Sequence, residues 1–130
     1  MNSYLPLIRD YAQRMGLHIL HEEESDEILV VQDDTRGVCN LVLDCEDPIL
    51  VMEQVIMEVK IPSMELYQRL LQLNRRWLHG AFVLDEEAKR VIFRDTLQIE
   101  NLDFNEFEGS INALSLGLAE FSQELLQLNR

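Results

Sequence analysis

The stretch 63–97 constrains the fold most, because the spacing of its apolar residues changes at Gly80. Before this glycine, apolar side chains recur every three or four residues, which is typical of an amphipathic helix. After it they alternate with polar ones over 81–85 and 90–99, as in β-strands, and a polar turn separates the two segments. The stretch therefore predicts a helix that ends at a glycine and continues as a β-hairpin.

The helix of this stretch carries two adjacent apolar stripes, which together form one broad face. Ser63 is placed to cap its start, and Arg75, Arg76 and His79 are expected in its last turn, where positive charge suits the helix dipole. A broad apolar face indicates that the helix packs both on its own sheet and on a second subunit. The residues expected at this dimer interface are Leu66, Leu70, Leu73 and Trp77.

Helices are also expected at both ends of the chain. The first covers 2–15, with Ser3 as its cap, and the last begins with Asp103 and Glu106 in capping-box spacing. Leu5 and Leu7 fall off the inner face of the first helix. They form either an exposed apolar patch that binds a client protein or a cover over a sheet edge.

Between the first two helices, alternating apolar residues predict strands within 17–31, over 38–45 and over 49–59. With the hairpin, the pattern indicates one α+β domain over 1–130. Its fold is a twisted antiparallel meander sheet of five to six strands with three helices, in the order α-β-β-β-α-β-β-α.

Composition narrows the possible partners. The formal net charge of −13 argues against nucleic acid and anionic membranes, because both are bound through Lys and Arg. It favours solubility first, and secondarily a basic partner. No signal peptide or membrane-spanning stretch is found. The two cysteines, Cys39 and Cys45, are expected to be free thiols, which indicates a cytoplasmic protein.

The residues show no set that would support catalysis or hold a metal or cofactor. His18 and His21 would lie on opposite faces of a strand, and His79 is explained as a cation at a helix end. The acidic run 22–27 lacks the spaced ligands and turning glycine of a calcium loop. No nucleophile motif or glycine-rich phosphate loop occurs. The sequence therefore predicts a non-catalytic protein without cofactors.

The run 70–97, LLQLNRRWLHGAFVLDEEAKRVIFRDTL, resembles the YbjN family, and the similarity extends through NLDFNEFEGSINAL and weakly back to LVLDCEDPIL. The resemblance implies the fold of type III secretion chaperones of the CesT kind. Those proteins are small, acidic cytosolic homodimers with a twisted antiparallel sheet and three helices, and they bind extended segments of client proteins.

Two functions remain open from the sequence. The first is a homodimeric, chaperone-like module that binds an extended or apolar segment of a client protein, for example by β-augmentation. The second is a regulatory or assembly factor that docks on a folded partner complex and has no chaperone activity. The identity of the client or partner is not encoded in any motif.

Overall fold

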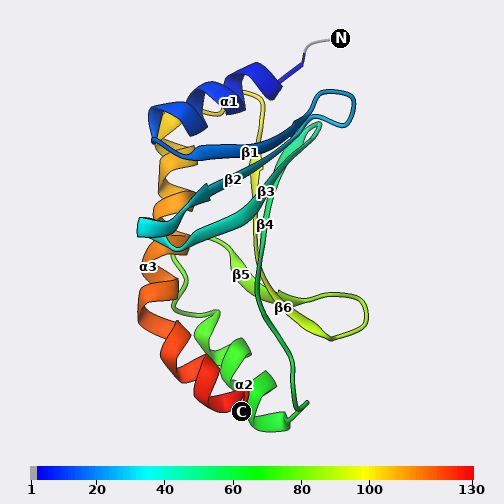
Figure 1. Ribbon diagram of the computed structural model, residues 1–130, viewed down its shortest axis with the longest axis vertical. Coiled ribbons are helices and arrows are strands. Elements are labelled where there is room, and N and C mark those ends of the chain that lie inside the picture. The colour runs from blue at the N-terminus through cyan, green and yellow to red at the C-terminus, as the bar shows by residue number, and fades with distance from the viewer. Residues whose placement is uncertain (1–2) are drawn as a thin grey trace.

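The computed structural model describes residues 3–130 and shows one antiparallel sheet with helices packed against it (Figure 1). The first helix is predicted to begin at residue 2, and this position lies outside the described residues. Along the chain, the elements are α1 (Leu5–Arg14), β1 (His18–Glu23), β2 (Ile28–Asp33), the 3-10 turn η1 (Asp34–Arg36), β3 (Val38–Glu46), β4 (Ile49–Glu58), α2 (Met64–Leu73), β5 (Ala81–Leu84), β6 (Arg90–Gln98) and α3 (Phe104–Leu128).

The strand order in the sheet is β1-β2-β3-β4-β6-β5, with every neighbouring pair antiparallel. The predicted α+β class and antiparallel sheet are confirmed. Four strands precede α2, one more than the predicted element order contains. Strands β1 to β4 form a meander, and β6 then pairs with β4, which leaves the short strand β5 at the edge.

Figure 1 shows α3 running along one side of the sheet, with α1 near one end of it and α2 near the other. Side chains alternate between the two faces of the sheet. Those on one face are buried against these helices, as in an antiparallel sheet that is covered on one side. Each fully buried large apolar side chain contributes roughly 1.5–3 kcal/mol of transfer free energy. The largest of them are Phe93, Phe107, Ile8, Leu29, Leu41, Leu43, Leu50, Met52, Leu66, Leu73, Ile99 and Ile111.

Helix α3 begins as its sequence predicts. Asp103 accepts a hydrogen bond from the Glu106 backbone N–H at 2.8 Å, and the Glu106 side chain accepts one from the Asp103 N–H, which completes the capping box. At its other end, the buried Asn129 side chain bonds both to Lys60 N–H and to Glu58 C=O. The 25-residue helix is therefore tied to the end of β4.

The start of α1 differs from the prediction. Its N-cap is Tyr4, which has no capping side chain of its own, and the predicted cap Ser3 lies one residue earlier. Instead, the Glu27 carboxylate from the β1–β2 turn accepts bonds from Tyr4 N–H (2.9 Å), Leu5 N–H (3.3 Å) and the Ser3 hydroxyl (2.8 Å). These bonds, with the Ser3 hydroxyl first, lower the pKa of Glu27. A residue distant in sequence thus supplies the negative charge that a helix N-terminus favours.

Helix α2 ends earlier than predicted, at Leu73 and not near Gly80, although Ser63 caps it as expected by accepting from Leu66 N–H at 3.1 Å. The reason lies in Asn74. Its side chain accepts from Phe82 N–H at 2.7 Å and donates to Phe82 C=O at 3.1 Å, which binds the chain to β5. The segment 74–80 is therefore a loop, and the expectation that Arg75, Arg76 and His79 lie in the last turn of the helix is wrong.

Candidate functional site

The four residues predicted at a dimer interface lie in the core of their own chain. Leu66, Leu70 and Leu73 lie on the buried face of α2, and Trp77 follows in the loop after the helix. The Trp77 ring contacts three phenylalanine rings at centroid distances of 5.0–5.4 Å; these are Phe82, Phe93 and Phe121. These side chains have almost no surface left for a second subunit, and a dimer itself stays a prediction.

The stripe of small residues on α3 explains how Trp77 is accommodated. A Cβ atom at Gly117 would lie 2.0 Å from the Trp77 ring, so only glycine lets the ring approach the helix backbone. Ala113 is also buried on this face. These small residues therefore serve close packing inside the subunit.

The two residues predicted to bind a client also face inward. Leu5 is buried, and Leu7 is partly buried against the same core. Of the two interpretations left open by the sequence, the structure favours a cover over the sheet for Leu5. Client binding through either residue stays a prediction.

The outward side of α2 carries apolar side chains that are exposed to solvent. Met64 and Leu71 on α2, and Leu78 in the following loop, are all exposed. Beside them, α2 and the edge strand β5 enclose an apolar groove of about 240 Å³. Its walls are Tyr67, Leu70, Leu71, Phe82, Val83 and Leu84. Among the described residues no strand lies beyond β5, although Asn74 occupies the main-chain groups of Phe82 on that side. A strand edge next to apolar side chains is the arrangement that natural proteins use for adding a strand from a partner.

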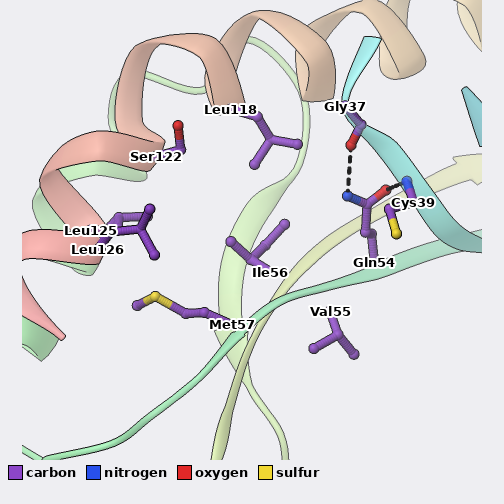
Figure 2. A pocket seen from close by; sticks show the side chains of 10 residues that line it. All are labelled: Gly37, Cys39, Gln54, Val55, Ile56, Met57, Leu118, Ser122, Leu125 and Leu126. Atoms are coloured by element: carbon purple, nitrogen blue, oxygen red, sulfur yellow. Dashed lines mark hydrogen bonds between the residues drawn. The ribbon is translucent and has the colours of Figure 1, made fainter. Parts of the chain in front are cut away.

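A second groove, of about 310 Å³, lies between the sheet and the C-terminal half of α3 (Figure 2). Its floor comes from the start of β3 and the end of β4, and its roof comes from α3. None of its lining residues is charged, although the chain as a whole is strongly acidic. The lining consists of Gly37, Cys39, Gln54, Val55, Ile56, Met57, Leu118, Ser122, Leu125 and Leu126.

Gln54 is the polar centre of this second groove and is only 4% exposed. Figure 2 shows its carboxamide between two backbone groups: it accepts from Cys39 N–H at 3.0 Å and donates to Gly37 C=O at 3.0 Å. Both hydrogen-bonding ends of a buried amide are thus satisfied. The sequence predicts a strand over 49–59, and the neighbours of Gln54 along the chain give no signal of this role.

The charges outside the grooves are unevenly paired. Among residues 3–130, seven ion pairs each join a carboxylate to one of Arg9, Arg36, Arg69, Arg76, Lys89, Arg90 and Arg94. Since Asp and Glu number 24 against 11 Lys and Arg, the carboxylates far outnumber the cationic side chains that could pair with them. On β3, partial burial, and then the charges of Glu46, Asp26 and Glu53, raise the pKa of Asp44 to about 6.

The two grooves are candidate binding surfaces, and catalysis would in addition need reactive groups such as metal ligands or a nucleophile. Over residues 3–130, no three His, Cys, Asp or Glu side chains come close enough to hold a metal ion. Cys45 is buried, and burial raises the pKa of its thiol to about 12, so it is a poor nucleophile. Among the described helices, none has the length and apolar character needed to cross a membrane.

Comparisons with known proteins agree with this picture. The fold is similar to that of YbjN from E. coli, a proposed transcription regulator, with a TM-score of 0.68 and 17% identity over 92% of each chain. It is also similar to a chain in the crystal structure of the ExsC–ExsE complex. There the TM-score is 0.64 and the identity 25%, over 94% of this chain and 92% of that one.

A search of curated proteins gives no match. The family model CesT_Tir_1, however, matches residues 1–130. The resemblance to YbjN and to CesT-type proteins, first seen in the run 70–97, is therefore confirmed by both fold and family. The chain belongs to the CesT_Tir_1 family and has a chaperone-like, protein-binding fold.

Proposed function

We propose that this protein is a non-catalytic, homodimeric chaperone-like module of the cytoplasm, which binds an extended or apolar segment of a client protein. One observation carries the proposal: an apolar groove lies between α2 and the edge strand β5, whose outer edge has no strand partner within residues 3–130 and is bonded at Phe82 by the Asn74 side chain alone. An extended client segment can hydrogen bond to such an edge while its alternate side chains enter the groove. Membership of the CesT_Tir_1 family, and the similarity to a chain of the ExsC–ExsE complex, support a role in binding another protein.

The homodimer would form through the outward side of α2, with the predicted residues Leu66, Leu70, Leu73 and Trp77 supporting the helix from within. Exposed apolar residues at Leu71 and Leu78 are costly to leave in water and would be covered by the same surface of a second copy.

The dimer is tested by the double variant Leu71→Glu, Leu78→Glu, with Leu20→Glu as control because Leu20 is an exposed leucine on β1. Light scattering should report about half the wild-type mass for the double variant and the wild-type mass for the control. An unchanged mass of the double variant would show that α2 is not the dimer contact, and a monomeric wild type would refute the homodimer.

Client binding is tested by crosslinked pull-down of the tagged protein from its own cytosol, with salt washes and mass spectrometry. We expect one dominant partner, crosslinked through an extended segment. The purified protein should then suppress aggregation of that partner. Recovery of a folded complex whose aggregation is unaffected would instead identify a regulatory or assembly factor.

A further inference from the structure

Strands β3 and β4 separate partway along their length. They pair from Glu46–Ile49 to Val42–Glu53, and the pairing then ends. Beyond that point, β3 remains paired with β2 as far as Val38, and β4 remains paired with β6 as far as Glu58. Figure 1 shows the two strands diverging. We call the opening between residues 38–41 and 54–58 the fork; neither of its two facing edges is paired with the other.

Irregularities in both strands explain why the fork opens. The register of β4 against β6 shifts between Val55 and Met57, which leaves Ile56 as an extra residue in β4. A bulge of this kind bends the strand and increases its twist. On the other side, Asn40 of β3 has a left-handed backbone with φ of 50°. Both strands thus turn away from their common direction at the same level of the sheet.

The Gln54 side chain closes the inner end of the fork by imitating a strand. In a parallel ladder, one residue donates to a C=O and accepts from an N–H that lie two residues apart on its neighbour. The Gln54 carboxamide bonds to the C=O of Gly37 and the N–H of Cys39 in this pattern. A side-chain amide therefore occupies the place of a main-chain peptide group beside β3.

Past Gln54, the edge of β4 facing the fork has no strand partner, and α3 covers the space above it. Leu118 extends from α3 toward Ile56 in Figure 2, and Leu125 and Met57 line the same groove. Leu126, which is 60% exposed, lies at the rim of the groove. The fork thus combines an edge of β4 that has no strand partner in the described part of the chain with an apolar, uncharged cavity.

We propose that the fork binds a short, uncharged, extended peptide segment of a partner protein. The segment lies antiparallel to β4 and pairs with β4 alone, because Gln54 already bonds the main chain of Gly37 and Cys39 on the other side. Its main chain bonds to the edge of β4 over 55–57, and alternate apolar side chains enter the space beneath α3. This assignment rests on the proposed function, because it names a second place where a client segment is held.

A peptide fits the fork better than a small apolar molecule does. The groove volume of about 310 Å³ is at the lower limit of ligand pockets, which span roughly 300–1,000 Å³. An apolar molecule would fill the cavity but leave the N–H and C=O groups of the β4 edge without partners. Removing such groups from water without hydrogen bonds is unfavourable, whereas an added strand satisfies them.

The probe is a capped, fluorescent peptide with alternating Val and Thr over five residues, flanked by Ser. Its control has the same side chains but N-methyl groups on alternate amides, which removes main-chain donors. We expect the first peptide to bind by fluorescence anisotropy with a Kd below about 1 mM. The N-methylated peptide should bind about tenfold more weakly or not at all. Bound peptide should also slow maleimide labelling of Cys39, which is exposed at the groove, while buried Cys45 stays unlabelled.

Two variants locate the peptide. Leu126→Lys places a charge at the rim of the groove, whereas Leu116→Lys makes the same change at a leucine of α3 with similar exposure, 64%, outside this groove. The first should weaken binding about tenfold and the second should leave it within about twofold. Equal losses in both variants, no binding up to about 1 mM, or equal binding of the N-methylated peptide would each overturn the assignment.

The same pair of variants separates this inference from the proposed function. A client recovered by pull-down that binds Leu126→Lys as well as wild type leaves the client-binding function intact and refutes the fork as its site. Weakened client binding by Leu126→Lys, with none by Leu116→Lys, supports the fork.

Discussion

The two halves of β4 belong to one strand but are held in different ways. Over Ile49–Glu53, the strand pairs with β3 on one side and β6 on the other, and Leu50 and Met52 are fully buried. Over 54–58, only β6 pairs with it, and Val55 is 53% exposed. In the second half, the amide of Gln54 and the side chains of α3 stand where a neighbouring strand would be.

This difference teaches how one strand can serve both the core and a binding surface. Pairing on both edges fixes the backbone and leaves no hydrogen-bonding groups for a partner. Pairing on one edge leaves a template for an added strand, at the cost of lower local stability. The Gln54 amide limits that cost, because it satisfies Gly37 C=O and Cys39 N–H while closing only the inner end of the fork.

The sharpest test compares cavities made in the two halves. Leu50→Ala in the paired half should lower the free energy of unfolding by about 3 kcal/mol, because it deletes a fully buried side chain. Val55→Ala in the other half should cost less than about 1 kcal/mol, since that side chain is half exposed. Urea denaturation followed by circular dichroism measures both. Similar losses would mean that the halves are equally well packed.

A second test removes the amide that imitates a strand. Gln54→Leu keeps an apolar side chain of similar size but leaves Gly37 C=O and Cys39 N–H without their partner. We expect a loss of about 2 kcal/mol in stability. Amide hydrogen exchange at Cys39 should accelerate by a larger factor than at residues 42–46, which keep their strand pairing.

Gln98→Leu is the matched control for that variant, because Gln98 is an exposed strand residue of β6. It should change stability by less than about 0.5 kcal/mol and leave exchange at Cys39 as in wild type. If Gln54→Leu behaved like this control, the amide would have no structural role in the fork.

The features that sequence predicts well are those that depend on neighbouring residues. The capping box of Asp103 and Glu106, the period of α3 and the alternation in the hairpin all act within a few positions along the chain. By contrast, Glu27 caps a helix 22 residues before it, and Asn74 ends α2 through bonds to Phe82. Such contacts depend on tertiary structure, and the spacing of neighbouring residues does not predict them.

The candidate site was harder to predict for the same reason. A broad apolar stripe identifies α2 as amphipathic, but the stripe cannot show which part faces the subunit's own sheet. Leu66 and Leu70 proved to be core residues, and Leu71 lies outside. The fork depends on a bulge at Ile56 and on where β3 stops pairing. Because the segment 49–59 carries apolar residues on both faces, its sequence does not show where a one-residue shift of register occurs.

The paired half of β4 also creates a charge problem that the fork half does not have. Pairing brings Asp44 opposite Val51, and Glu46 and Glu53 repel its negative charge. Partial burial is the largest cause of the raised pKa of about 6, and these charges follow. Because the ordinary pKa is 3.8, the folded protein binds a proton at Asp44 more tightly than the unfolded chain does.

The smallest predicted effect follows from this proton. Its contribution to stability is complete below about pH 4 and is lost as the pH rises through about 6. Asp44→Asn carries no charge at any pH, so it should raise the free energy of unfolding at pH 7.5 by about 1 kcal/mol, allowing for solvent screening. At pH 4 the variant and wild type should be equally stable. Glu24→Gln, in an exposed turn, should show no such pH-dependent gain; a gain of equal size would assign the effect to net charge and not to the crowding imposed by strand pairing.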